Sequence, residues 1–230
     1  FVACGTSLHA AKTARKWFED ICEMPCYIDF ASEYRYRNPI VEDHTLFVTI
    51  SQSGETADTL AALEYARAEK YVGIVTICNV PTSTMARNAD WKIFTNAGPE
   101  IGVASTKAFT TQLAALLMLA LSIAKSQDKN AKKRKQATQE LRETPALVDQ
   151  AFSLKENISQ ITQNISTKHN ALFLGRGMYF SIAQEGALKL KEISYIHAEA
   201  YPAGELKHGP LALVDEQIPV IALAPEDSLV

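Results

Sequence analysis

A hydroxyl-rich loop between an apolar run and an amphipathic stretch constrains this chain more than any other feature. The run 46–50, LFVTI, is β-branched and aromatic, which predicts a buried strand. From Thr56 onward, apolar residues recur at helical spacing with charges between them, which predicts a helix to about Tyr71. The loop from Ser51 to Thr56 therefore lies at the carboxyl end of a strand, where open α/β sheets bind ligands.

This loop offers hydrogen-bond donors without a basic side chain. Its side-chain donors are three hydroxyls and one amide, those of Ser51, Ser53, Thr56 and Gln52. The start of a helix adds oriented N–H groups and a partial positive charge, so the loop suits a phosphate group. An ordinary capping box, Ser53 with Thr56 or Glu55 nearby, also explains these six residues and stays open as the alternative.

Composition excludes several classes of protein. With 230 residues and 47% hydrophobic content, the chain can bury one large core or two small ones. A formal charge of −3 argues against a nucleic-acid partner. The longest apolar run, Leu113 to Ile123, is too short for a membrane span and predicts a buried helix.

The cysteines and the chain ends carry further expectations. Core-like residues without a histidine cluster surround all four thiols, those of Cys4, Cys22, Cys26 and Cys78. We therefore expect reduced thiols, a cytoplasmic protein, and no metal or cofactor, with a Cys22–Cys26 metal pair as a weak alternative. The chain begins without a methionine, as if in mid-strand, and stops without a closing helix. We expect a fragment of a longer protein.

Strands and helices alternate through the first half of the chain. Besides 46–50, strands are predicted near 1–3, 26–30, 72–78 and 91–94, and helices from about 8 to 21, 31–36 and 108–125. Such alternation implies parallel strands with right-handed crossovers. The expected fold class is α/β, a three-layer αβα sandwich around a parallel sheet.

Two more hydroxyl-bearing turns follow predicted strands. Thr6 and Ser7 come after the first strand, and the loop Gly98 to Lys107 precedes the long helix. Ser105 or Thr106 as a plain helix cap explains the second turn when it is taken alone. Because the carboxyl ends of parallel strands share one edge, three such turns together predict a polar pocket there.

The second half repeats the opening pattern after a polar connection. Residues 128–142 are the most polar part of the chain and include a basic run, 132–135; we interpret them as an exposed connection, although basic runs also bind nucleic acid. Helices are predicted at 144–153 and 158–166. A strand, a glycine turn and a helix follow at 171–174, 175–177 and 181–193, and another strand at 218–223 leads into the acidic stretch 224–228. Aligning residues 4–6 with 175–177 also brings the loop 51–54 close to 224–227, so the two halves repeat at a nearly constant offset. The repeat predicts two copies of one fold: a first subdomain at 1–127, a helical connection at 128–168 and a second, truncated subdomain at 169–230.

Titratable residues gather in this second half. Glu185, Lys189 and Glu192 are spaced by four and three, which places them on one helix face. The stretch 199–210 adds acids, a lysine and His208 between glycines. A carboxylate beside a lysine suits a general base, and a histidine suits proton transfer near neutral pH. A surface ion-pair row and a loop histidine without a catalytic role are the alternatives.

Five motifs in order along the chain resemble the sugar isomerase (SIS) family. They are CGTS at 4–7, SQSGET at 51–56, VASTK at 103–107, EGALKLKE at 185–192 and AGELKHGP at 203–210. The last two narrow the resemblance to the isomerase part of the glucosamine-6-phosphate synthase family, the glutamine:fructose-6-phosphate aminotransferases (isomerizing). The resemblance runs from end to end and implies two SIS-type subdomains.

It also implies a substrate and residue roles. The substrate is fructose 6-phosphate and the product glucosamine 6-phosphate, in the first step of amino-sugar synthesis. Four residues would hold the phosphate, Ser51, Gln52, Ser53 and Thr56; four would line the phosphate and sugar hydroxyls, Thr6, Ser7, Val103 and Ser105. Glu192 would move a proton between C1 and C2, Lys189 would assist, and His208 would assist ring opening across a homodimer interface.

The chain departs from that family at two points. The family's Schiff-base lysine lies in a C-terminal tail that this chain does not reach, and the glutaminase domain that supplies ammonia is absent; Cys4 is not its nucleophile. We therefore expect a fragment without full turnover. A non-catalytic phosphosugar-binding module and a simple aldose–ketose phosphate isomerase remain the alternatives.

Overall fold

The computed structural model describes residues 1–226, which form two compact units, Phe1–Ile123 and the part from Ala124 onward. The first unit contains a five-stranded sheet in the order β2-β1-β3-β4-β5. Its strands are β1 (Val2–Ala3), β2 (Asp29–Phe30), β3 (Leu46–Ile50), β4 (Gly73–Cys78) and β5 (Trp91–Phe94). All four pairings are parallel, as the alternation of elements predicted.

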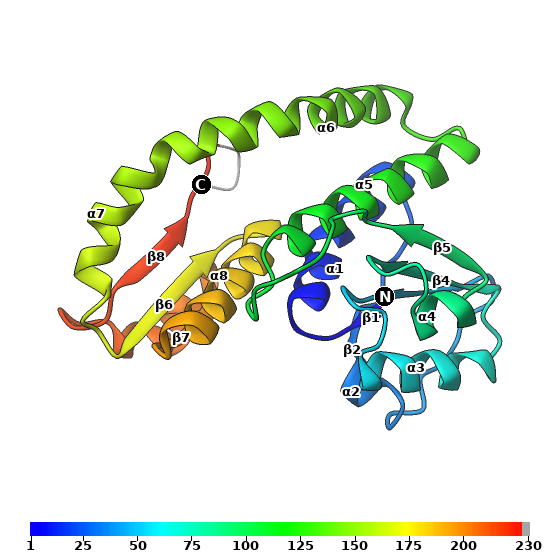
Figure 1. Ribbon diagram of the computed structural model, residues 1–230, viewed down its shortest axis with the longest axis horizontal. Coiled ribbons are helices and arrows are strands. Elements are labelled where there is room, and N and C mark those ends of the chain that lie inside the picture. The colour runs from blue at the N-terminus through cyan, green and yellow to red at the C-terminus, as the bar shows by residue number, and fades with distance from the viewer. Residues whose placement is uncertain (227–230) are drawn as a thin grey trace. The chain divides into compact units, whose positions relative to one another are not determined.

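Helices cover both faces of this sheet (Figure 1). One face carries α1 (Gly5–Trp17), continued by a π-helical segment η1 (Phe18–Cys22), and α5 (Lys107–Ser126). The other carries α2 (Ala31–Tyr34), α3 (Ala57–Arg67) and α4 (Thr84–Asn88). The three-layer αβα arrangement predicted from the sequence is confirmed.

The buried residues follow from these layers. The last four residues of β3 and the last five of β4 are buried, which is typical of parallel strands covered on both faces. On α3 the buried positions are Thr59, Ala62, Leu63 and Ala66, one face of a helix. This helix ends at Arg67, earlier than predicted, because the chain then turns and Val72 donates to the Thr45 carbonyl at the start of the sheet.

Helix α5 is the one helix among residues 1–226 that is long and apolar enough, by length and composition, to cross a membrane. A third of its apolar stretch is buried, and one face of α5 packs within the first unit. Ala108, Phe109, Ala115 and Leu116 are buried on its inner face. The Cys22 thiol also donates to the Ala120 carbonyl at 3.1 Å, which ties α5 to η1.

The second unit contains a three-stranded parallel sheet in the order β7-β6-β8. Its strands are β6 (Asn170–Gly175), β7 (His197–Pro202) and β8 (Val220–Leu223). Helix α8 (Met178–Ser194) packs on the sheet, with Ala187 against Ala171 and Ala198. The remaining elements are α6 (Ala131–Ala151), η2 (Phe152–Leu154), α7 (Lys155–Ile165) and two short 3₁₀ helices, η3 (Ala203–His208) and η4 (Pro210–Leu213).

The second sheet repeats the topology of the first. In each sheet the first strand lies between the second and third, and a helix follows the first strand directly, α1 after β1 and α8 after β6. The prediction of two copies of one fold is confirmed on this point. Of the acidic stretch expected after β8, Asp227 and Ser228 lie outside the described residues. The division at 127 and 168 stays a prediction.

Two elements differ from the sequence-based expectation. Strand β7 was not predicted, because its glutamate, proline and following glycine favoured a turn-rich stretch; pairing along the whole of β6 outweighs those local preferences. Helix α6 begins at Ala131 rather than at Thr144 and continues through Pro145. Its lysines, arginines and glutamates are strong helix formers, so the basic run 132–135 belongs to a helix.

Candidate functional site

The predicted phosphate loop begins where β3 ends, next to the start of α1. Strands β1 and β3 are neighbours, with Ala3 opposite Ile50, so Cys4 and Ser51 follow at the same edge. Thr6 and Ser7 lie in the first turn of α1, and Ser7 is buried. The parallel sheet thus brings these two groups of hydroxyls to one edge, as the sequence predicted.

Hydrogen bonds inside the loop determine which of its hydroxyl oxygens act as acceptors. Ser51 Oγ is buried, accepts from the Gly54 N–H at 3.1 Å and contacts Thr56 Oγ1 at 2.9 Å. Ser53 Oγ accepts from the Glu55 N–H at 3.1 Å. A hydroxyl that accepts in this way keeps its own proton for donation. Ser53 can therefore donate to an anion, and Ser51 can do so when Thr56 donates the bond between the two hydroxyls.

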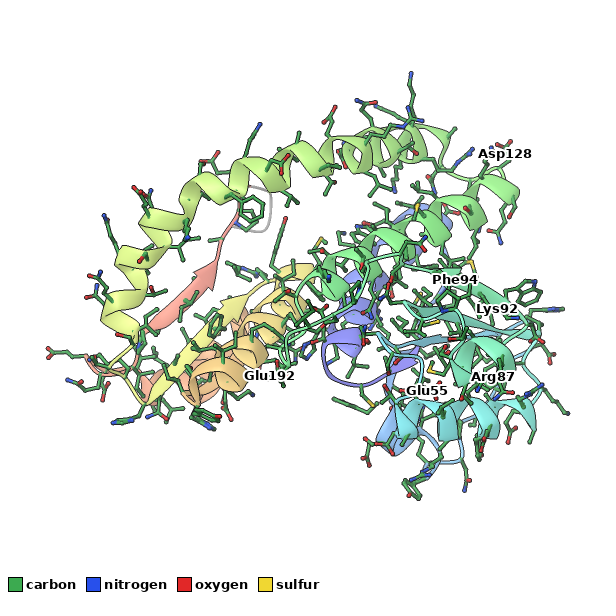
Figure 2. The ribbon with its side chains drawn as sticks, in the orientation of Figure 1. Glu55, Arg87, Lys92, Phe94, Asp128 and Glu192 are labelled. Atoms are coloured by element: carbon green, nitrogen blue, oxygen red, sulfur yellow. The ribbon has the colours of Figure 1, made fainter. Side chains whose placement is uncertain are left out.

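The loop is fastened to the segment after β4. Asn79 N–H donates to the Gln52 carbonyl and Met85 N–H to the Gly54 carbonyl, both at 3.1 Å. Gly54 has φ of +67°, and a Cβ there would lie 2.2 Å from Ser83 Oγ, so only glycine fits. Glu55 reaches the same segment, and Figure 2 shows it on the side of the first unit that carries α3 and α4.

Helix α3 begins without a side-chain cap. Its N-cap residue is Thr56, whose side chain makes no capping hydrogen bond, and Ser53 bonds within the loop instead. The capping alternative for this loop is therefore wrong. The N–H groups of the first turn of α3 are left for another acceptor, which supports anion binding.

The second donor loop, between β5 and α5, is tied to the first through Asn79. Asn79 Nδ2 donates to the Gly98 carbonyl at 2.7 Å, and its Oδ1 accepts from the Ala97 N–H at 2.8 Å. Glu100, rather than Ser105, accepts from the first turn of α5, through the Ala108 N–H at 3.3 Å. Ser105 Oγ is buried without a hydrogen-bond partner among the described residues. The shared sheet edge is confirmed; the pocket, and the role of the exposed Val103, stay predictions.

The predicted acid–base residues lie on α8 in the second unit. Lys189 Nζ is 2.6 Å from Glu192 Oε2 and 3.4 Å from Glu185 Oε1. Glu185 is buried, whereas the Glu192 side chain is one-third exposed. Figure 2 labels Glu192 on α8. The predicted common face of the three residues is confirmed, and the charge-assisted bond from Lys189 holds the Glu192 carboxylate in one orientation.

His208 is the last residue of η3 and is exposed; Gly209 follows with φ of 133°. Glu199, in the same predicted cluster, lies on β7 and is engaged locally. Its carboxylate accepts from the Tyr201 hydroxyl, which raises the pKa of that tyrosine, and lies 3.5 Å from His197 Nε2. Glu199 is therefore held within β7 by its two neighbours.

Sequence reasoning missed Gln112, and it missed the long-range contact of Glu55; both polar residues support the donor loops. Gln112 is fully buried in α5 and bonds to Ser7. Its signal was present, since it is the polar member of the helical series Phe109, Gln112, Leu116. Glu55 Oε1 accepts from the Thr84 N–H at 2.7 Å. No local pattern points to that contact.

These features define a class of protein: parallel α/β units with hydroxyl loops at the carboxyl edge and, at α3, a helix start without a side-chain cap, suited to anionic ligands. The SIS domain family matches residues 1–122 and 164–229. The chain belongs to the SIS domain family.

Related proteins align with nearly the whole of this chain. A glutamine–fructose-6-phosphate aminotransferase (isomerizing) of Legionella pneumophila (strain Paris) is 56% identical over 99% of this chain. The chain spans 37% of that relative's length. The C-terminal domain of glucosamine-fructose-6-phosphate aminotransferase from Francisella tularensis has a TM-score of 0.96 and 55% identity, covering 99% of this chain and 65% of that one. A glucosamine-6-phosphate deaminase from Thermotoga maritima, 26% identical, has a TM-score of 0.81 and covers 99% of this chain and 68% of that one.

Proposed function

We propose that this chain is the sugar isomerase part of an enzyme that converts fructose 6-phosphate and glutamine-derived ammonia to glucosamine 6-phosphate. The observation that carries the proposal is the identity of 56% over 99% of the chain with a protein of that name. The proposal includes a cytoplasmic homodimer that works with a glutaminase domain.

The first unit binds the sugar phosphate. Ser51, Ser53 and the uncapped start of α3 supply donors to the phosphate oxygens. Gln52 and Thr56 complete the phosphate ligands, while Thr6, Ser7, Val103 and Ser105 line the phosphate and the sugar hydroxyls. Neutral donors at a helix start suit a dianion, since each charge-assisted hydrogen bond contributes about 1.5–3 kcal/mol.

The second unit supplies proton transfer. Glu192 takes the proton from C1 or C2 of the open-chain sugar and returns it to the other carbon, which interconverts ketose and aldose. Lys189 orients the carboxylate from 2.6 Å. His208 assists ring opening. A positioned base of this kind contributes about 10²–10⁴-fold in rate.

A titration tests phosphate recognition. Calorimetry on the 230-residue chain should detect glucosamine 6-phosphate but not unphosphorylated glucosamine, and Ser51→Ala should weaken binding by about 1–3 kcal/mol. The half-buried Ser32 on α2, whose hydroxyl bonds to the neighbouring Glu33, provides the matched control Ser32→Ala. Equal binding of the two sugars would remove phosphate recognition from the proposal.

Deuterium incorporation tests the base. Incubation with fructose 6-phosphate in D₂O should label C1 or C2 of the sugar, and Glu192→Gln should slow labelling about 10²–10⁴-fold with little change in the dissociation constant. Glu156→Gln, on α7, is the control. If the unsubstituted chain binds fructose 6-phosphate but incorporates no deuterium, the non-catalytic phosphosugar-binding module is favoured. Labelling without nitrogen incorporation, when ammonia is supplied to the longer protein, would favour the simple isomerase.

A further inference from the structure

A buried polar contact joins α1 to α5 beneath the proposed sugar-phosphate site. Gln112 Nε2 donates to Ser7 Oγ at 3.0 Å, across 105 residues of sequence. The two side chains are almost inaccessible, with Gln112 1% and Ser7 7% exposed. Gln112 occupies the buried face of α5 beside Phe109 and Leu116, where an apolar residue would pack without loss. A glutamine at this position therefore has a polar role.

The other end of the same amide is an unpartnered acceptor. Gln112 Oε1 is buried and has no hydrogen-bond partner among the described residues. Ser105 Oγ, two residues before α5, is in the same condition. Buried polar atoms are nearly always paired in folded proteins, so two orphaned atoms at one end of α5 point to a ligand or a bound water that pairs with them.

The direction of the Gln112–Ser7 hydrogen bond determines whether the Ser7 hydroxyl can donate to a ligand. The amide nitrogen only donates, so Ser7 Oγ accepts and its own proton is directed elsewhere. A phosphate or sugar oxygen is an acceptor and needs that proton. The free carbonyl of Gln112 is itself an acceptor, suited to a sugar hydroxyl or a water.

We propose that Gln112 is a positioning residue of the phosphosugar site, which holds the Ser7 hydroxyl as a donor toward the ligand. The inference rests on the proposed function, because it assumes that Ser7 contacts the sugar phosphate. It adds a residue of α5 that acts through Ser7 and that none of the sequence motifs singles out.

A double-mutant cycle on glucosamine 6-phosphate binding tests this role. Gln112→Met keeps the length and volume of the side chain and removes both hydrogen-bonding groups. We expect Gln112→Met and Ser7→Ala each to raise the dissociation constant about tenfold, and the double variant to raise it about tenfold rather than a hundredfold. Gln139→Met, which removes an exposed glutamine that bonds to Glu143, is the matched control and should leave affinity unchanged.

The outcomes separate this inference from the proposed function. If the parent chain binds and the two substitutions act additively, Gln112 does not act through Ser7 and the inference is overturned while the function stands. If the parent chain binds no sugar phosphate, the function fails and the inference fails with it. Circular dichroism establishes that each variant is folded; should Gln112→Met not fold, Gln112→Asn, which keeps the amide but is one methylene too short to reach Ser7, should show the same coupled loss.

Discussion

At the scale of single residues, Glu55 links the donor loop to α4 and makes that link dependent on pH. Its carboxylate accepts from the Thr84 N–H at 2.7 Å, and this bond lowers the pKa of Glu55 below its ordinary 4.5. A carboxyl with a lowered pKa in the folded state stabilises the protein above the pKa of the unfolded chain, and that stabilisation is lost as the pH falls through the folded value.

Glu55→Gln tests this dependence. A neutral amide accepts the same hydrogen bond more weakly than a carboxylate, so the variant should melt below the parent protein above about pH 4.5. The gap should close as the pH falls further, because Glu55 then becomes neutral too. Thermal unfolding followed from pH 7 to pH 3 measures it, and Glu64→Gln, which removes a charge from the exposed side of α3, controls for net charge. A gap that does not vary with pH would contradict the role assigned to Glu55.

How far single residues could be predicted depended on how far away their partners lie. The hydroxyls of Ser51 and Ser53 were predicted as donors because strand, loop and helix are contiguous in the sequence. Their own bonds, to backbone N–H groups three and two residues on respectively, were not foreseen but are local. Gln112 and Glu55 have partners 105 and 29 residues away, and no pattern within one segment encodes such a contact.

At the scale of elements, the donor loop and the start of α4 are packed so closely that Gly54 admits no side chain. Gly54→Ala should destabilise the protein in two ways. The left-handed backbone costs about 1–2 kcal/mol for a non-glycine residue, and the clash with Ser83, at 2.2 Å, costs about 1–3 kcal/mol more. Urea unfolding measures the sum.

Ser83→Gly separates the two contributions. Ser83 Oγ caps α4 by accepting from the Ala86 N–H at 3.3 Å, and replacing a cap by glycine costs only a few tenths of a kcal/mol. Combined with Gly54→Ala, this substitution should restore the part of the stability lost to the clash and leave the part lost to the backbone. Additive losses in the double variant would show that the two segments do not touch as described.

The boundaries of a strand were predictable where the residues in it favour strand structure and turn residues flank it. Strands β3 and β5 have the predicted bounds: β3 is a buried apolar run, and β5, although partly exposed, is rich in aromatic and β-branched residues that favour a strand. Strand β7 contains His197, Glu199 and Pro202, whose preferences oppose a strand, and only the neighbouring β6 explains it. Such pairing partners are set by the whole fold rather than by the segment itself.

At the scale of the whole molecule, the first unit has all the layers of a complete domain. Its sheet is covered on both faces, and the proposed phosphate ligands all belong to it, whereas Glu192 and His208 belong to the second unit. Residues 1–126, which end with α5, are of ordinary domain size and should fold alone. We expect one cooperative urea transition with a slope of about 1–3 kcal/mol/M.

This piece should also separate binding from proton transfer. Because the phosphate donors lie in the first unit, residues 1–126 should bind glucosamine 6-phosphate, with an affinity that Ser51→Ala lowers about tenfold. Because Glu192 is missing from it, the piece should not label fructose 6-phosphate in D₂O. If residues 1–126 fold but bind no sugar phosphate, the donors at the carboxyl edge of the first sheet are not sufficient for phosphate binding. A piece that binds and labels would place the base in the first unit and overturn the role proposed for Glu192.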